Sequence, residues 1–151
     1  MKLNLIPQVG LVVRDADAAF ARFEQYFGAD RSQLDISDSR DPNLRCRDFT
    51  AHGEPQLYKG RFLCFPLGGI EVELIQPLDD KGPYAEFLAE HGDGIHHLLF
   101  RPDDPDAFEQ IMAETGSPLI ASGHIESTDF RYFDGRDVFG MILELCRRAP
   151  F

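Results

Sequence analysis

The stretch Gly94-Ile95-His96-His97-Leu98-Leu99-Phe100 decides how this chain is interpreted. A glycine that lets the chain turn is followed by an apolar, β-favouring run, and two histidines stand at the entry of that run. Because side chains alternate along a strand, we expect His96 and His97 to point to opposite faces. At most one of the two imidazoles can then point into a given cavity.

Three other polar side chains stand inside apolar, strand-like runs. They are Gln8 within residues 6–13, Glu73 within residues 70–75 and Glu144 within residues 141–145. A carboxylate with apolar neighbours on both sides is costly to bury unless a cation or hydrogen bonds compensate its charge. Four such side chains on four strands predict one shared cation, held by Gln8, Glu73, His97 and Glu144.

Length and composition limit the class of protein. A chain of 151 residues with 43% hydrophobic and 27% charged residues is typical of a globular protein, and it is long enough for one domain with a real core or for two small fused modules. The net charge of −11 argues against nucleic acid and anionic membranes as partners, but not against a small anionic substrate. The cysteines have no CxxC spacing, and the sequence shows neither a signal-peptide pattern nor an apolar run of membrane-spanning length. We therefore expect a cytoplasmic protein.

The first half of the chain predicts a strand over residues 4–13, followed by an amphipathic helix. Asp15 and Asp17 supply an N-cap and early negative charge for this helix, and Gly28 ends it. Polar residues 29–43 predict a long excursion. Short strands are expected near residues 45–51, 60–66 and 69–77.

The second half has the same order of elements. A short helix over residues 83–91 joins the halves, and a strand over 95–101 follows. Asp103-Asp104-Pro105 starts an amphipathic helix that Gly116 ends. Strands near 118–122, 128–133 and 139–146 complete this half.

The two halves therefore indicate a fused duplication of a βαβββ unit. Gln8 lies 20 residues before Gly28 and His97 lies 19 residues before Gly116, while Glu73 and Glu144 fall in the fourth strand of their halves. We predict an α+β fold in which two tandem βαβββ modules form a curved mixed sheet around a metal-site cavity. The domain is a single one over 1–151, with module one at about 1–78, a linker at about 79–93 and module two at about 94–151.

Two carboxylates, one imidazole and one amide oxygen suit a divalent ion that prefers oxygen and nitrogen: Co²⁺, Zn²⁺, Ni²⁺, Mn²⁺ or Fe²⁺. Such an ion polarises a carbonyl and stabilises an enolate, while a neighbouring carboxylate moves the α-proton. Glu144 and Glu73 are the candidate bases. Structural roles stay open for each residue: a hydrogen-bonded strand amide for Gln8, a core histidine for His97, and a solvent-facing acidic stripe for Glu73 together with Glu71.

The chain resembles the vicinal oxygen chelate superfamily of glyoxalase, bleomycin-resistance and extradiol-dioxygenase proteins along nearly its whole length. Residues 69–78 and 87–98 look most like the methylmalonyl-CoA epimerase family, and residues 139–145 are similar to the last strand of the superfamily. The resemblance implies metal ligands at Glu73, His97 and Glu144. It implies a first ligand at Gln8, where epimerases usually have histidine and some glyoxalase I enzymes have glutamine. Glyoxalase I also has an arginine at the position of Val12.

The expected function is a divalent-metal-dependent isomerase that moves a proton next to a carbonyl through an enolate, as in epimerisation of a 2-substituted acyl-CoA thioester. Glu144 is the predicted base, with Glu71 or Glu73 assisting, and Glu54 is another candidate for the second carboxylate. A glyoxalase-type lyase or isomerase is the alternative, favoured by Gln8, and a non-catalytic small-molecule-binding protein of the same fold is a further one. A homodimer is expected.

Overall fold

The computed structural model describes residues 1–3, 6–125 and 128–148, which form two compact units, each discontinuous in sequence. The α1 unit consists of Gln8–Leu44 and Lys59–His96. The α3 unit consists of the described residues within Met1–Pro7, Arg45–Tyr58 and His97–Phe151. The boundary at His96 and His97 falls inside one strand, so the two histidines belong to different units.

The α1 unit is a four-stranded mixed sheet with one long helix. Its strands lie in the order β2-β5-β6-β1, with β1 parallel to β6 and the other neighbours antiparallel. The strands are β1 (Gln8–Val12), β2 (Asp35–Asp38), β5 (Gly60–Leu67) and β6 (Ile70–Pro77). The helical elements are α1 (Ala16–Phe27), the short 3₁₀ helix η1 (Arg31–Gln33) and α2 (Gly82–His91).

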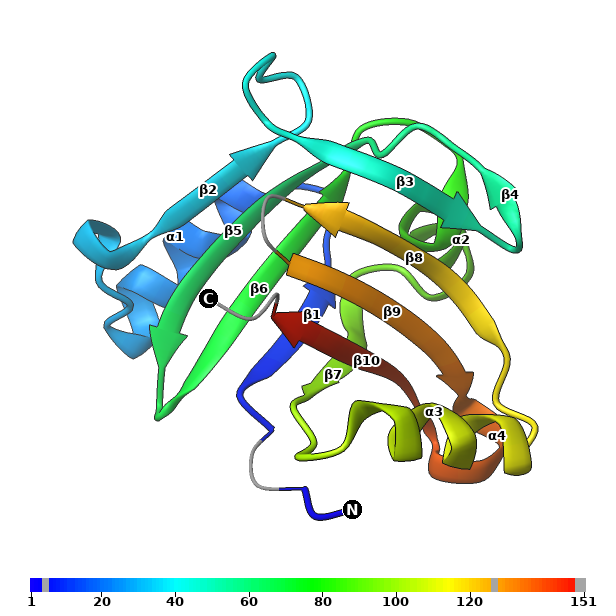
Figure 1. Cartoon of the computed structure of the whole chain (residues 1–151). Helices are drawn as coiled ribbons and strands as arrows, with labels where there is room; N and C mark the ends of the chain where they lie inside the picture. The colour runs from blue at the N-terminus through cyan, green and yellow to red at the C-terminus, as the bar shows by residue number, and fades with distance from the viewer. Residues whose placement is uncertain (4–5, 126–127, 149–151) are drawn as a thin grey trace. The chain divides into compact units, whose positions relative to one another are not determined.

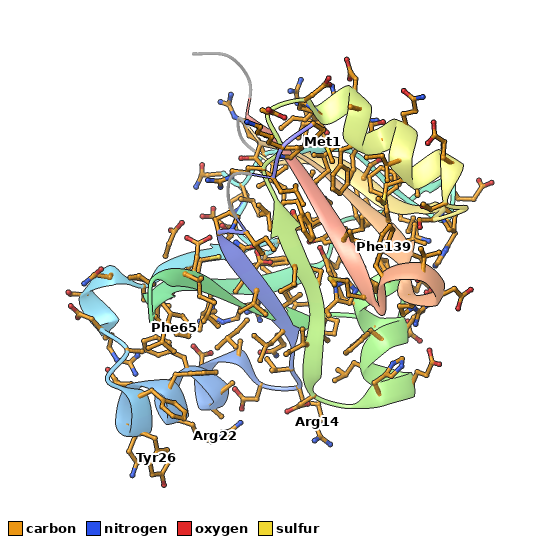
Figure 2. The ribbon with its side chains drawn as sticks, turned by 90° about the horizontal axis from the view of Figure 1, so that it is seen from below. Met1, Arg14, Arg22, Tyr26, Phe65 and Phe139 are labelled. Carbon is orange, nitrogen blue, oxygen red and sulfur yellow. The ribbon has the colours of Figure 1, made fainter. Side chains whose placement is uncertain are left out.

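Helix α1 begins and ends where the sequence predicts. The Asp15 side chain accepts a hydrogen bond from the Ala18 amide, and Gly28 ends the helix in the left-handed conformation at φ 71°. The helix buries Phe20 against Phe65 of β5, with ring centroids 4.9 Å apart. Figure 2 shows Phe65 between the sheet and α1, and Tyr26 on the outer side of the helix. One face of β5 and β6 therefore packs against α1.

The α3 unit repeats this arrangement and adds two strands. Its strands lie in the order β7-β10-β9-β8-β3-β4, with β7 parallel to β10 (Figure 1). The repeated strands are β7 (Gly94–Phe100), β8 (Leu119–Ile125), β9 (Thr128–Gly135) and β10 (Met141–Arg148). The added strands are β3 (Cys46–Ala51) and β4 (Glu54–Pro55), and the helices are α3 (Pro105–Glu114) and α4 (Arg136–Phe139).

Helix α3 corresponds to α1 in its cap and in its packing. The Asp104 side chain accepts from the Ala107 amide, as the acidic pair before Pro105 predicts. Phe108 packs edge-on against Phe133 of β9 at 6.1 Å, within a cluster that includes Leu145 of β10. Each unit thus has one sheet face covered by its helix and an opposite face available for other side chains.

Two expectations for the first half need correction. Residues 29–43, expected to be an excursion, contain η1 and β2. Strand β2 was missed because it is an edge strand of Asp, Ile, Ser and Asp with little apolar alternation. The strand expected near 45–51 exists as β3, but it pairs with β8 of the α3 unit instead of joining the first repeat.

The other predicted elements are confirmed within two or three residues, apart from the first strand. That strand, predicted over 4–13, is β1 over Gln8–Val12, and residues 4–5 lie outside the described part of the chain. Among the described residues, no helix is both long and apolar enough to cross a membrane.

Candidate metal centre

In the α3 unit, β7 and β10 bring a buried imidazole next to a buried carboxylate. His97 is 0% exposed and Glu144 is 6% exposed. His97 Nε2 lies 2.8 Å from Glu144 Oε2. The parallel register pairs Leu99 with Glu144, so His97 and Glu144 are diagonal neighbours on the face opposite α3. Two of the four predicted ligands are therefore in contact.

The contact between His97 and Glu144 is not an ordinary hydrogen bond. Glu144 Oε2 is buried and accepts no hydrogen bond from the residues that the structure describes. Its short approach to His97 Nε2 therefore lacks hydrogen-bond geometry. A buried carboxylate oxygen without a donor is costly unless a cation compensates it. An imidazole nitrogen and a carboxylate oxygen are also common ligands of divalent metals, so the pair fits such an ion.

Tyr132 is an aromatic neighbour of His97. Its ring lies edge-on to the imidazole with centroids 4.9 Å apart, and it is 3% exposed. Tyr132 of β9 stands opposite Glu144 in the antiparallel register of β9 and β10. The sequence does not single out Tyr132, because only the pairing of β9 with β10 brings it beside the two polar side chains.

In the α1 unit, the structure places Gln8 on β1 and Glu71 and Glu73 on β6. Gln8 is 8% exposed, and its Nε2 donates a hydrogen bond of 2.6 Å to Glu71 Oε1. Burial alternates along β1, so Gln8 shares a face with Gly10 and Val12, as predicted. Glu71 is exposed, whereas Glu73 is half-buried. The predicted amide ligand is thus held by a carboxylate.

Glu73 lies opposite Cys64 in the register of β5 and β6. The Cys64 thiol donates a weak hydrogen bond to Glu73 Oε1, with Sγ 3.8 Å from the oxygen. Burial raises the pKa of the Cys64 thiol, and the negative charges of Glu73 and Glu71 raise it further. Cys64 therefore stays a neutral thiol beside Glu73 near neutral pH.

The strand registers of the two units support the internal duplication. In the α1 unit, Gln8 pairs with Glu71, and Glu73 lies two residues further along β6. In the α3 unit, His97 pairs with Ile142, and Glu144 lies two residues further along β10. Gln8 therefore corresponds to His97, and Glu73 corresponds to Glu144.

His96 lies in different surroundings from His97. It is 3% exposed and packs beside two aromatic side chains of α2, with ring centroids 5.3 Å from Tyr84 and 5.1 Å from Phe87. His97 packs against Tyr132 of β9 instead. The expectation that the two neighbouring histidines diverge is confirmed.

Four basic side chains, which could in principle neutralise an anionic substrate, form ion pairs with carboxylates of this chain. Arg61 bonds Asp17 and Asp38. Lys59, Arg131 and Arg136 pair with Asp79, Glu109 and Asp134. Each of the four cations therefore has a carboxylate partner within the described chain.

The chain matches one family model and is similar in sequence to a curated epimerase. A family model of the glyoxalase/bleomycin resistance protein/dioxygenase superfamily matches residues 7–134. An ethylmalonyl-CoA/methylmalonyl-CoA epimerase from Cereibacter sphaeroides is 25% identical over 122 residues, which cover 80% of this chain and 78% of that protein.

Solved structures show the same fold. Methylmalonyl-CoA epimerase from Mycobacterium tuberculosis superimposes with a TM-score of 0.67 at 21% identity, covering 99% of this chain and 94% of that chain. A variant of the Streptomyces coelicolor epimerase in complex with 2-nitronate-propionyl-CoA has a TM-score of 0.64 at 18% identity, covering 99% and 100%. The predicted α+β fold of two βαβββ modules is therefore confirmed as a vicinal oxygen chelate fold, and the chain belongs to the glyoxalase/bleomycin resistance protein/dioxygenase superfamily.

Proposed function

We propose that this chain is a divalent-metal-dependent isomerase that moves a proton next to a carbonyl through an enolate. The observation that carries the proposal is the buried pair of His97 and Glu144, in which Glu144 Oε2 accepts no hydrogen bond within the described chain. Burying such a carboxylate in an apolar strand costs free energy, so its presence there indicates a functional role. The relationship to epimerases supports this choice of reaction.

The proposed ligands are Gln8, Glu73, His97 and Glu144. Glu73, His97 and Glu144 offer carboxylate and imidazole donors of the kind that hold a metal ion; Glu73 is half-buried, and His97 and Glu144 are buried. The equivalent positions of Gln8 with His97 and of Glu73 with Glu144 add support. Nitrogen and oxygen donors suit Co²⁺, Zn²⁺, Ni²⁺, Mn²⁺ or Fe²⁺. When bound, the ion supplies positive charge that stabilises an enolate oxygen.

The chain's own carboxylates would move the proton. Glu144 is the proposed base, because its two oxygens let it act as a ligand through one and accept a proton through the other. Epimerisation needs a second group to return the proton to the opposite face of the enolate. Glu73, Glu71 and Glu54 are the candidates. Glu54 is exposed on β4 and Glu71 already accepts from Gln8, which favours Glu73.

The proposed substrate class is a 2-substituted acyl-CoA thioester. One similar structure is a methylmalonyl-CoA epimerase in complex with methylmalonyl-CoA, and another is in complex with 2-nitronate-propionyl-CoA. A thioester carbonyl acidifies its neighbouring C–H bond, so a positioned carboxylate and a cation suffice for proton transfer.

A glyoxalase-type isomerase or lyase is the second candidate, and Gln8 is the observation that favours it. An amide stands where epimerases usually have an imidazole ligand. Turnover of a hemithioacetal, with no exchange into acyl thioesters, would select this candidate. A protein that binds ligand but no divalent ion would instead be a non-catalytic module of the same fold.

The test is deuterium exchange into a 2-methyl-substituted acyl-CoA in D₂O, with the protein loaded with Co²⁺. Glu144→Gln keeps the shape of the side chain and should lower the exchange rate by about 10²-fold or more, because the base is lost. Glu90→Gln, at an exposed position on α2, is the matched control and should exchange like the parent chain. Unchanged exchange in Glu144→Gln would leave Glu144 with a structural role.

The assembly and compartment are proposed as a homodimer in the cytoplasm. The three free cysteines, Cys46, Cys64 and Cys146, are compatible with a reducing compartment. Light scattering on the purified chain measures the oligomeric state directly, and a mass of one chain would exclude the dimer.

A further inference from the structure

Gln8 and His97 occupy equivalent positions in the two repeats, but their partners on the neighbouring strand differ. In the α1 unit the residue paired with Gln8 is Glu71, and in the α3 unit the residue paired with His97 is Ile142. The Glu71 carboxylate accepts from Gln8 Nε2 at 2.6 Å. The proton transfer proposed above does not explain why a carboxylate stands at one of these equivalent positions and an isoleucine at the other.

The chemistry of the two side chains explains the difference. An amide has an oxygen that can bind a cation and a nitrogen that cannot, and the two ends have nearly the same shape. A carboxylate only accepts hydrogen bonds, so it must face the NH₂ end of the amide. The Gln8 oxygen is then turned away from Glu71. At the equivalent position of the other repeat, His97 packs edge-on against Tyr132.

We propose that Glu71 is a positioning residue that holds the Gln8 amide with its oxygen directed towards the bound metal. The inference rests on the proposed metal function and adds to it a reason for the Gln8–Glu71 contact. Partners of this kind fix the orientation of a ligand before the ion binds, and their loss typically weakens metal affinity by about 10–100-fold. Glu71 then contributes to metal binding without touching the metal.

The first test measures Zn²⁺ affinity by competition with a chelating dye. Glu71→Gln and Glu71→Ile, the latter introducing the residue of the other repeat, should each weaken binding by about tenfold or more. Glu114→Gln is the matched control, because Gln110 Nε2 donates to Glu114 in the same kind of contact on the exposed side of α3. It should leave the affinity unchanged.

A double-mutant cycle asks whether Glu71 acts through Gln8. In a Gln8→Ala background, Glu71→Gln should cause no further loss of affinity, because the amide to be oriented is absent. An equal loss in both backgrounds would mean that Glu71 acts on the ion directly, and would overturn the inference.

A metal-free measurement completes the test. In ¹⁵N NMR spectra of the apo protein, the Gln8 side-chain NH₂ resonances should shift in Glu71→Gln, whereas Glu114→Gln should shift those of Gln110. Thermal unfolding confirms that each variant is folded. If His97→Ala abolishes Zn²⁺ binding while Glu71→Gln stays within about twofold of the parent, the inference fails and the metal function stands. If the parent chain binds no ion, both fail.

Discussion

The thiol of Cys46 shows how burial controls chemistry at a single residue. Burial raises its pKa to about 11, and the nearby charge of Asp48 adds to the effect. Because the thiolate is the reactive form, alkylation of Cys46 at pH 8 should be about 100-fold slower in the folded protein than in the unfolded chain. Mass spectrometry of iodoacetamide-treated protein, folded and in urea, measures both rates. A folded-state rate that levels off near pH 9 would contradict this prediction.

At the residue scale, much of the candidate site could be predicted from the sequence. Gln8, Glu73, His97 and Glu144 stand out because each interrupts an apolar strand, and alternation alone separates His96 from His97. The contacts from Gln8 to Glu71, from Cys64 to Glu73 and from Tyr132 to His97 could not be predicted. They depend on strand registers between residues far apart in the chain.

At the scale of elements, the packing of α1 on β5 can be tested with two aromatic residues of the same helix. Phe20 is 1% exposed and packs on Phe65, whereas Phe27 is 69% exposed. Phe20→Ala should lower the free energy of unfolding by about 3–5 kcal/mol, because it leaves a cavity in the core. Phe27→Ala should change it by no more than about 0.5 kcal/mol. Urea denaturation measures both, and equal effects would contradict this account of the helix.

The stability that the edge strand β2 contributes to the fold should depend on pH, because it depends on the charge of Asp38. Hydrogen bonds from Arg40, with a further one from Arg61, hold the pKa of this carboxyl well below its usual range. A depressed pKa stabilises the fold above the unfolded-state value near pH 4, and the stabilisation is lost as the pH falls through the folded-state pKa.

Asp38→Asn should therefore destabilise the protein by about 1 kcal/mol at pH 7 and by progressively less below pH 4. Denaturant titrations at several pH values measure this difference. Asp137→Asn, at an exposed position, is the control. It should leave the pH dependence of the free energy of unfolding as in the parent chain. A loss that stays constant from pH 7 to pH 2 would exclude the electrostatic explanation.

Most elements could be predicted because their signals are local. Asp15 and Gly28 bound α1, and Asp104 caps α3. Strand β2 could not be predicted because an edge strand carries little apolar alternation. The pairing of β3 with β8 could not be predicted either, because nothing within residues 46–51 specifies a partner about seventy residues away.

At the scale of the whole molecule, the duplication supports the proposed metal-dependent function. Each unit contributes one buried polar residue on its first strand and one carboxylate on its fourth: Gln8 and Glu73, and His97 and Glu144. Neither pair alone offers the three or four ligands that divalent ions usually take in proteins. The proposed function therefore requires that both units contribute ligands to one ion.

The most direct measurement of this central claim is anomalous diffraction at the zinc edge from crystals grown with Zn²⁺. The account predicts one strong peak about 2.0–2.2 Å from ligand atoms of Glu73, His97 and Glu144, with the Gln8 oxygen as the fourth protein ligand. The peak should disappear in His97→Ala and persist in the exposed-site variant Glu90→Gln. Peaks confined to surface carboxylates, or ligand side chains that point away from one another, would contradict the account.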